Sequence, residues 1–141
     1  MRILVINGPN LNLLGKRDTS LYGSKTLDEI NALVAERGKE LDVEIFDYQS
    51  NHEGDLVDYI QSQTAGADGI IINPGALTHY GLSLMDAIID SQLPVIEVHL
   101  SDIHSREEFR RVSVIEPIAQ KQISGKGWQG YIEALEFLVD L

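Results

Sequence analysis

The sequence of 141 residues contains no cysteine, no long apolar run and few basic residues. Without cysteine the chain has neither disulfides nor thiolate metal ligands, which fits a reducing compartment, and we therefore expect a cytoplasmic protein. No apolar stretch approaches the roughly 20 residues that a helix needs to span a bilayer. The first residues also lack the apolar segment and small-residue cleavage site of a secretory signal.

Positive charge is scarce: 11 Lys and Arg residues stand against 22 Asp and Glu residues, a formal net charge of −11. A protein that binds a nucleic-acid duplex needs a basic face to displace counterions, so this composition argues against a nucleic-acid partner. The few cations cluster at two places, Arg106 with Arg110 and Arg111, and Lys16 with Arg17. Local basic patches on an acidic protein fit a small anionic ligand. Most clusters of this kind, taken singly, are solvated surface segments.

The sequence does contain an alternation of short apolar runs and amphipathic segments. The apolar runs predict five strands, at residues 2–7, 43–49, 69–73, 94–100 and 120–124. The amphipathic segments predict four helices, at residues 26–41, 50–63, 81–91 and 130–141. Thr26 and Glu29 form a capping-box pattern at the start of the first helix. Together they predict an α/β fold in one domain over residues 1–141, with a flavodoxin-like, doubly wound, five-stranded parallel sheet flanked by helices.

One segment, INGPNLNLLGKRDTSLYG at residues 6–23, interrupts this alternation. It combines four glycine and proline residues with three asparagines, a Lys-Arg pair and one tyrosine, and little in it suits a helix or a strand. Loops of this length in compact domains are usually functional lids or disordered segments. We interpret this one as a catalytic lid.

Three polar segments follow predicted strands: NGPNLNLLGKR after the first, NPGALTHYG after the third and HLSDIHSREEFRR after the fourth. In doubly wound folds, ligands bind beyond the carboxyl ends of the strands. These segments hold three of the four histidines and most of the clustered arginines. We therefore expect the functional site where they meet.

Two pairs of residues in these segments suit acid–base chemistry. Glu97 and His99 are two residues apart on a predicted strand, so their side chains share one face. A carboxylate beside an imidazole can fix its tautomer and hold its proton for donation, although the two could equally be a structural pair. Arg17 precedes Tyr22 by five residues, and a nearby guanidinium would stabilise the phenolate, so that the tyrosine could act as a general base. Most tyrosines in loops only pack or lie at the surface.

Other kinds of site find less support in the sequence. A metal site would have to draw its ligands from different segments, namely from His79, Glu97, His99 and His104, and no HExxH-like spacing is present. We expect no metal and no cofactor. The segment NGPNLNLLG has neither a GxGxxG nor a P-loop pattern, and the chain has no GxSxG elbow. A response regulator would need acidic residues at the ends of the first and third strands, where this chain has asparagines.

Five motifs, spread in order over essentially the whole chain, resemble those of the type II 3-dehydroquinate dehydratases. They are INGPNLNLLGKR followed by YG, QSNHEG, INPGALTH, IEVHLSDIHSREEFR and GWQGY. The resemblance implies a flavodoxin-like enzyme, free of cofactor and metal, that converts 3-dehydroquinate to 3-dehydroshikimate by anti elimination through an enolate. This is a step of the shikimate pathway, and it serves aromatic biosynthesis and quinate breakdown alike. The resemblance also implies a homo-oligomer, a dodecamer built as a tetramer of trimers.

The same resemblance implies a role for each candidate site residue. Tyr22 would be the base, with Arg17 stabilising its phenolate, and Asn10 would help to hold a water molecule that stabilises the enolate oxygen. His99, oriented by Glu97, would donate a proton to the departing hydroxyl group. The remaining candidates would bind the substrate: its carboxylate would meet Asn73 and the backbone N–H groups near Leu100 and Ser101, and its ring hydroxyls would meet His79, Arg110 and, from a neighbouring subunit, Asp86.

Two alternatives from other functional classes stay open at this point. One is a non-catalytic flavodoxin-like domain that binds a small anionic metabolite, and the other is an isomerase or hydrolase on the same fold. We interpret Arg106 as a lid or structural arginine. After Arg17, Thr19 follows Asp18 where the family pattern has proline, which predicts a more flexible lid.

Overall fold

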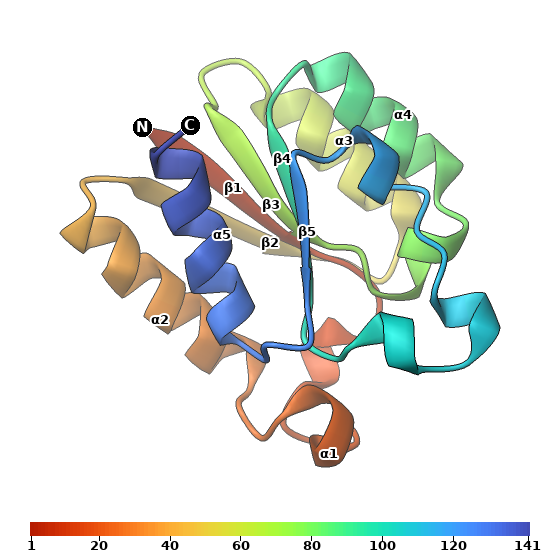
Figure 1. Ribbon diagram of the computed structural model, residues 1–141. Coiled ribbons are helices and arrows are strands. Elements are labelled where there is room, and N and C mark those ends of the chain that lie inside the picture. Colours follow the sequence, from red (N-terminus) through yellow and green to blue (C-terminus); the bar gives the residue numbers. More distant parts are fainter.

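The computed structural model describes all 141 residues and contains one sheet of five strands between two pairs of helices (Figure 1). All neighbouring strands are parallel, in the spatial order β2-β1-β3-β4-β5. The strands are β1 (Arg2–Asn7), β2 (Glu44–Gln49), β3 (Gly69–Asn73), β4 (Val95–His99) and β5 (Lys121–Ser124). This order is that of the flavodoxin-like fold and confirms the predicted fold class.

Two helices cover each face of the sheet (Figure 1). Helices α2 (Leu27–Glu40) and α5 (Gln129–Val139) pack on one face, and α3 (Glu53–Gln63) and α4 (Leu82–Ser91) pack on the other. The central strands are buried on both faces, which explains why their sequences show no alternation of polar and apolar residues. None of the helices is both long enough and apolar enough to cross a membrane.

The predicted capping box at the start of α2 is present. The hydroxyl of Thr26 accepts a hydrogen bond from the backbone N–H of Glu29, and the carboxylate of Glu29 accepts one from the backbone N–H of Thr26. These two bonds satisfy N–H groups that have no partner inside the helix. They also mark the end of the segment that follows β1.

That segment contains more regular structure than the sequence predicts. It includes a 3-10 helix at Leu11–Leu13 and a one-turn helix, α1, at Thr19–Tyr22. Asp18 begins α1 by accepting hydrogen bonds from the hydroxyl and the backbone N–H of Ser20, which hold the pKa of the Asp18 carboxyl below its usual value. The expectation that little here would be helical was wrong, because a single capped turn is too short to show helical periodicity.

The loops after β1 and β3 pack closely against each other beyond the carboxyl ends of the strands. A Cβ atom on Gly8 would lie 2.4 Å from the carbonyl oxygen of Pro74, so only glycine fits there. Gly75 has φ of +60° and approaches the carbonyl oxygen of Pro9 in turn. The two glycines therefore let both loops meet at the carboxyl ends of the strands (Figure 1).

Candidate active site

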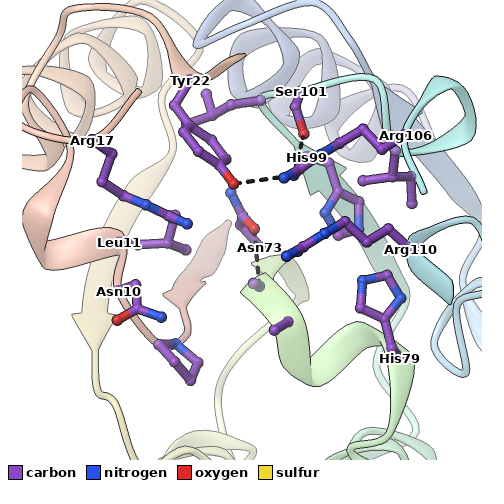
Figure 2. A pocket seen from close by; sticks show the side chains of 15 residues that line it. Asn10, Leu11, Arg17, Tyr22, Asn73, His79, His99, Ser101, Arg106 and Arg110 are labelled. Carbon is purple, nitrogen blue, oxygen red and sulfur yellow. Dashed lines mark hydrogen bonds between the residues drawn. The ribbon is translucent and has the colours of Figure 1, made fainter. Parts of the chain in front are cut away.

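A cavity of about 150 Å³ lies beyond the carboxyl ends of β1, β3 and β4 (Figure 2). Its walls come from the loop after β1, from α1, from the loop after β3 and from the loop after β4. The residues that line it are Pro9, Asn10, Leu11, Arg17, Tyr22, Asn73, Gly75, Ala76, His79, His99, Leu100, Ser101, Ile103, Arg106 and Arg110. The three polar segments selected from the sequence thus form one cavity.

Two guanidinium groups surround the ring of Tyr22, which is half-buried (Figure 2). The guanidinium carbon of Arg17 lies 3.9 Å from the ring centroid, in a cation–π contact. Arg106 makes the contact with the phenol oxygen: its Nη1 donates a hydrogen bond of 3.0 Å to that oxygen and lies 3.4 Å from Oγ of Ser101. The phenol therefore points into the cavity and toward a cation that the sequence had assigned only to the lid or the scaffold.

Glu97 and His99 do share one face of β4, and they are in contact. Nε2 of His99 lies 2.5 Å from Oε2 of Glu97, and both side chains are buried. Burial raises the pKa of the Glu97 carboxyl, but hydrogen bonds from His99, Thr78 and Ser113 outweigh it and hold that pKa below its usual value. Because Glu97 is ionised at neutral pH, Nε2 of His99 carries the proton in this contact, and Nδ1 is the ring nitrogen available to a ligand.

Asn73, at the end of β3, is held by two hydrogen bonds. Its Oδ1 accepts from the backbone N–H of Gly75 at 3.1 Å, and its Nδ2 donates to the hydroxyl of Tyr131 at 3.0 Å. Tyr131 is fully buried and in turn donates to Oδ1 of Asn7 at 2.6 Å. An amide nitrogen carries two hydrogens, so one N–H of Asn73 is left for the cavity.

The backbone after β4 supplies further donors to the cavity. Leu100 and Ser101 line it and are almost fully buried, and neither backbone N–H donates a hydrogen bond within the chain. Buried N–H groups usually have partners. Two neighbouring unpaired donors next to Asn73 therefore form a site suited to an anion.

Asn10 lies across the cavity in a left-handed conformation, with φ of 70°. Its backbone N–H donates to Oδ1 of Asn51 at 2.9 Å, and Gln49 donates both to that same oxygen and to the carbonyl oxygen of Gly8. The side chain of Asn10 makes no hydrogen bond within the chain and is oriented toward the cavity (Figure 2). Residues of the QSNHEG motif therefore hold the backbone that carries Asn10.

His79 and Arg110 form the opposite wall (Figure 2). Nδ1 of His79 lies 2.7 Å from the carbonyl oxygen of Val112, so Nδ1 carries the proton and Nε2 is left for a ligand. Nε of Arg110 donates to Glu107 at 2.5 Å, which leaves its terminal nitrogens free of that ion pair. Both residues can offer polar groups to hydroxyls of a bound molecule.

Comparisons with known proteins identify the family to which this chain is similar. A family profile described as "Dehydroquinase class II" matches residues 1–139. A 3-dehydroquinate dehydratase of Roseiflexus castenholzii is 58% identical over 139 residues, which cover 99% of this chain and 88% of the relative. One from Halothermothrix orenii is 50% identical over 140 residues, covering 99% of this chain and 95% of the relative. The crystal structure of the type II dehydroquinase from Butyrivibrio crossotus has a TM-score of 0.95 at 48% identity, covering 98% of this chain and 97% of that one.

The chain belongs to the class II dehydroquinase family. Its membership, together with the names of its relatives, makes it an enzyme of the lyase class. The fold of the family is the one described above, and the cavity at the carboxyl ends of its strands is the candidate active site.

Two candidate residues of this class II dehydroquinase do not line the cavity. Glu97 lies behind it and reaches it only through His99. Asp86 is exposed on α4 and faces solvent. An exposed position is what a residue would need in order to reach a neighbouring subunit, as the resemblance implies.

The four candidate metal ligands of this family member are not brought together. The imidazole of His104 contacts a different residue: its Nε2 lies 2.7 Å from Oε1 of Gln122. Gln122 belongs to β5, where it pairs in register with Glu97 of β4. Nowhere do three or more His, Asp or Glu side chains come close enough to hold a metal ion.

Sequence reasoning missed several residues that the site of this dehydroquinase contains. Arg106 contacts the Tyr22 phenol, Thr78 and Ser113 contact Glu97, and Tyr131 holds Asn73. Thr78 stands directly before His79 in the INPGALTH motif, which was the available signal. No signal in the sequence pointed to Ser113, because a serine in an irregular segment shows no periodicity.

Proposed function

We propose that this protein dehydrates 3-dehydroquinate to 3-dehydroshikimate, a step of the shikimate pathway, by anti elimination through an enolate. In this proposal residues 1–141 form one catalytic domain that uses a tyrosine base and a histidine acid without a cofactor. One observation carries it: Tyr22 and His99 line the same cavity, the first beside guanidinium groups and the second beside a buried carboxylate. The names of the relatives supply the substrate.

The substrate carboxylate binds to the unpaired N–H groups of Leu100 and Ser101 and to the free N–H of Asn73. These donors are buried, so their hydrogen bonds to a charged group are stronger than they would be in water. His79 and Arg110 bind ring hydroxyls from the opposite wall. Binding at both ends fixes the ring between the proposed base and the proposed acid.

Tyr22 acts as the base in its phenolate form. The hydrogen bond from Arg106 and the cation–π contact with Arg17 both favour negative charge on the phenol oxygen. The phenolate removes the proton α to the ketone, and the C–H electron pair forms the enolate. Asn10 holds a water molecule that donates to the enolate oxygen.

His99 acts as the acid in the second step. The enolate collapses, the C–O bond of the leaving hydroxyl breaks, and Nδ1 of the imidazolium donates a proton to that oxygen, so that water departs. Glu97 accepts the Nε2–H bond and stabilises the imidazolium before the transfer. The proton gained by Tyr22 and the proton lost by His99 balance over one turnover.

The lid controls when the substrate enters the cavity and when the cavity is closed to water. Arg17 and Tyr22 belong to the segment that joins β1 to α2, whereas most of the other lining residues follow β3 and β4. The substrate enters when this segment is displaced. Its return brings base and cations over the ring and excludes water, which strengthens their electrostatic effect.

The proposal includes a homo-oligomer, a dodecamer of four trimers, in which Asp86 completes the site of a neighbouring subunit. Leu82, Asp86 and Ile89 lie at helical spacing on α4, and all three are exposed. Tyr80 and Phe109, near the cavity, are also exposed apolar residues. An apolar surface around Asp86 suits association. A cytoplasmic location fits the absence of cysteine.

An absorbance assay tests the reaction. The product is a conjugated enone, so ultraviolet absorbance should rise when the purified protein meets 3-dehydroquinate. The control is the Tyr22→Phe variant at the same concentration. Binding of 3-dehydroquinate without enone formation would support the non-catalytic alternative instead. Formation of a different product would support an isomerase or hydrolase.

A further inference from the structure

Three side chains converge on the fully buried carboxylate of Glu97. His99 is the partner toward the cavity, and the other two are the hydroxyls of Thr78 and Ser113. Thr78 Oγ1 lies 2.5 Å from Oε2 of Glu97, and Ser113 Oγ lies 2.9 Å from both carboxylate oxygens. Thr78 is fully buried and Ser113 is 7% exposed. The two hydroxyls come from chain segments on either side of β4 in the sequence.

The direction of the Ser113 hydrogen bond is fixed by its other partners. Its Oγ accepts the backbone N–H of Ile115 at 3.1 Å and that of Glu116 at 3.0 Å. A hydroxyl has two lone pairs and one hydrogen, so both lone pairs are occupied and the hydrogen is left for Glu97. Ser113 can therefore donate to Glu97 but cannot accept a proton from it.

Thr78 completes the arrangement. Its oxygen lies 2.9 Å from that of Ser113, whose lone pairs are already used, so the Thr78 hydrogen also goes to Glu97. Every neighbour of the carboxylate is then a donor. Hydrogen bonds donated to a carboxylate favour its ionised form, and burial alone would favour the neutral form. The pKa of Glu97 lies below its usual value, in agreement with this balance.

We propose that Thr78 and Ser113 are positioning residues that keep Glu97 ionised, so that His99 retains its proton until the leaving hydroxyl takes it. The inference rests on the proposed role of His99 as the acid. Without the two hydroxyls, the buried carboxylate would compete with His99 for that proton.

The first test separates this role from a structural one. Thr78→Val keeps the shape of the side chain and removes its hydroxyl, and Thr78→Ser keeps the hydroxyl. We expect Thr78→Val to lower kcat roughly tenfold, less than the about hundredfold loss of a general acid outright, with little change in KM. The limb of the pH profile on which kcat falls as pH rises should move down by about one unit. Thr78→Ser should restore both.

Ser113→Ala should act in the same direction as Thr78→Val. Its matched control is Ser91→Ala, because Ser91 is also buried and bonds only to backbone groups, at the end of α4 and outside the cavity. The hydroxyls would serve packing alone if kcat fell but the high-pH limb of its pH profile did not move. The same would hold if Thr78→Ser lost as much kcat as Thr78→Val. The same conclusion follows if Ser91→Ala reproduces the effect of Ser113→Ala.

A titration without substrate keeps the inference testable even if the proposed reaction is wrong. Carbon-13 labelled glutamate allows side-chain carboxyls to be followed by NMR as pH is lowered, and the Glu97→Gln variant identifies the Glu97 signal by its loss. We expect that signal to titrate about one unit higher in Thr78→Val than in the unmodified protein. Identical titrations in the two proteins would overturn the proposal.

Discussion

Arg106 and Tyr22 are joined by a hydrogen bond of 3.0 Å from Nη1 to the phenol oxygen, whereas Arg17 lies over the face of the ring. The two cations therefore act on the proposed base in different ways. A donor on the oxygen stabilises the charge where it is concentrated. A cation over the ring stabilises it through the π system, at greater distance.

We predict that loss of either arginine moves the limb on which kcat/KM rises with pH to higher pH, because the phenolate becomes harder to form. The shift should be larger in Arg106→Ala than in Arg17→Ala. Full pH profiles of both variants provide the measurement. Profiles that fall in height without moving would mean that the arginines only position the substrate or shape the lid.

The Tyr22→Phe variant tests the base itself. It removes one oxygen but keeps the ring on which Arg17 lies. We expect an unchanged fold by circular dichroism, retained ligand binding, and a kcat at least roughly a hundredfold lower, the low end for loss of a general base. Near-normal turnover would remove Tyr22 from the mechanism.

Glu97 should make stability depend on acid pH. Because its folded pKa lies below the usual 4.5, the unfolded chain takes up the proton more readily. The stabilisation is complete above about pH 4.5 and is lost as pH falls through the folded pKa. Urea unfolding between about pH 5 and 3 should show a steeper loss in the unmodified protein than in Glu97→Gln.

The control for that measurement is Glu133→Gln. Hydrogen bonds from Lys126 and Lys121 also lower the pKa of Glu133, but this side chain is partly exposed, and solvent screens its ion pairs. Its removal should leave the slope nearly unchanged. Parallel curves for Glu97→Gln and the unmodified protein would show that Glu97 is not held as an anion by the fold.

Tyr131→Phe should destabilise the protein through its buried network. The variant removes the acceptor of the Asn73 amide and the only hydrogen-bond donor to Oδ1 of Asn7, whose Nδ2 already has no partner. We expect a loss of about 1–3 kcal/mol in the free energy of unfolding. Tyr59→Phe is the matched control, since that hydroxyl donates no hydrogen bond and its ring stacks on Tyr48. Equal effects of the two substitutions would argue against the network.

Mixing two inactive variants tests the role of Asp86. Tyr22→Phe chains carry an intact Asp86, and Asp86→Ala chains carry an intact Tyr22, so mixed trimers can form a few complete sites. We expect activity to return after subunit exchange, and light scattering to show a trimer or larger assembly. Tyr22→Phe mixed with the double variant should stay inactive. A fully active monomer, or no recovery after verified exchange, would show that Asp86 does not act across subunits.

Much of the fold could be predicted because its determinants are local. Every predicted strand is present with ends within one residue, and the capping box at Thr26 is present. Hydrophobic periodicity and capping involve residues only a few positions apart. Helix α1 was missed because a single turn contains too few residues to show a period.

The sequence by itself determined the order of the elements and the three segments that would meet at the carboxyl ends of the strands. In a parallel sheet all strands end at the same edge, so the segments that follow them must lie together there. Only the tertiary structure decided which groups surround each reacting atom. Tyr22 meets Arg106 across 84 positions, and Asn73 meets Tyr131 across 58. Hydrogen bonds require partners within about 3 Å, and for side chains so far apart in irregular loops only the packing of whole segments sets that distance.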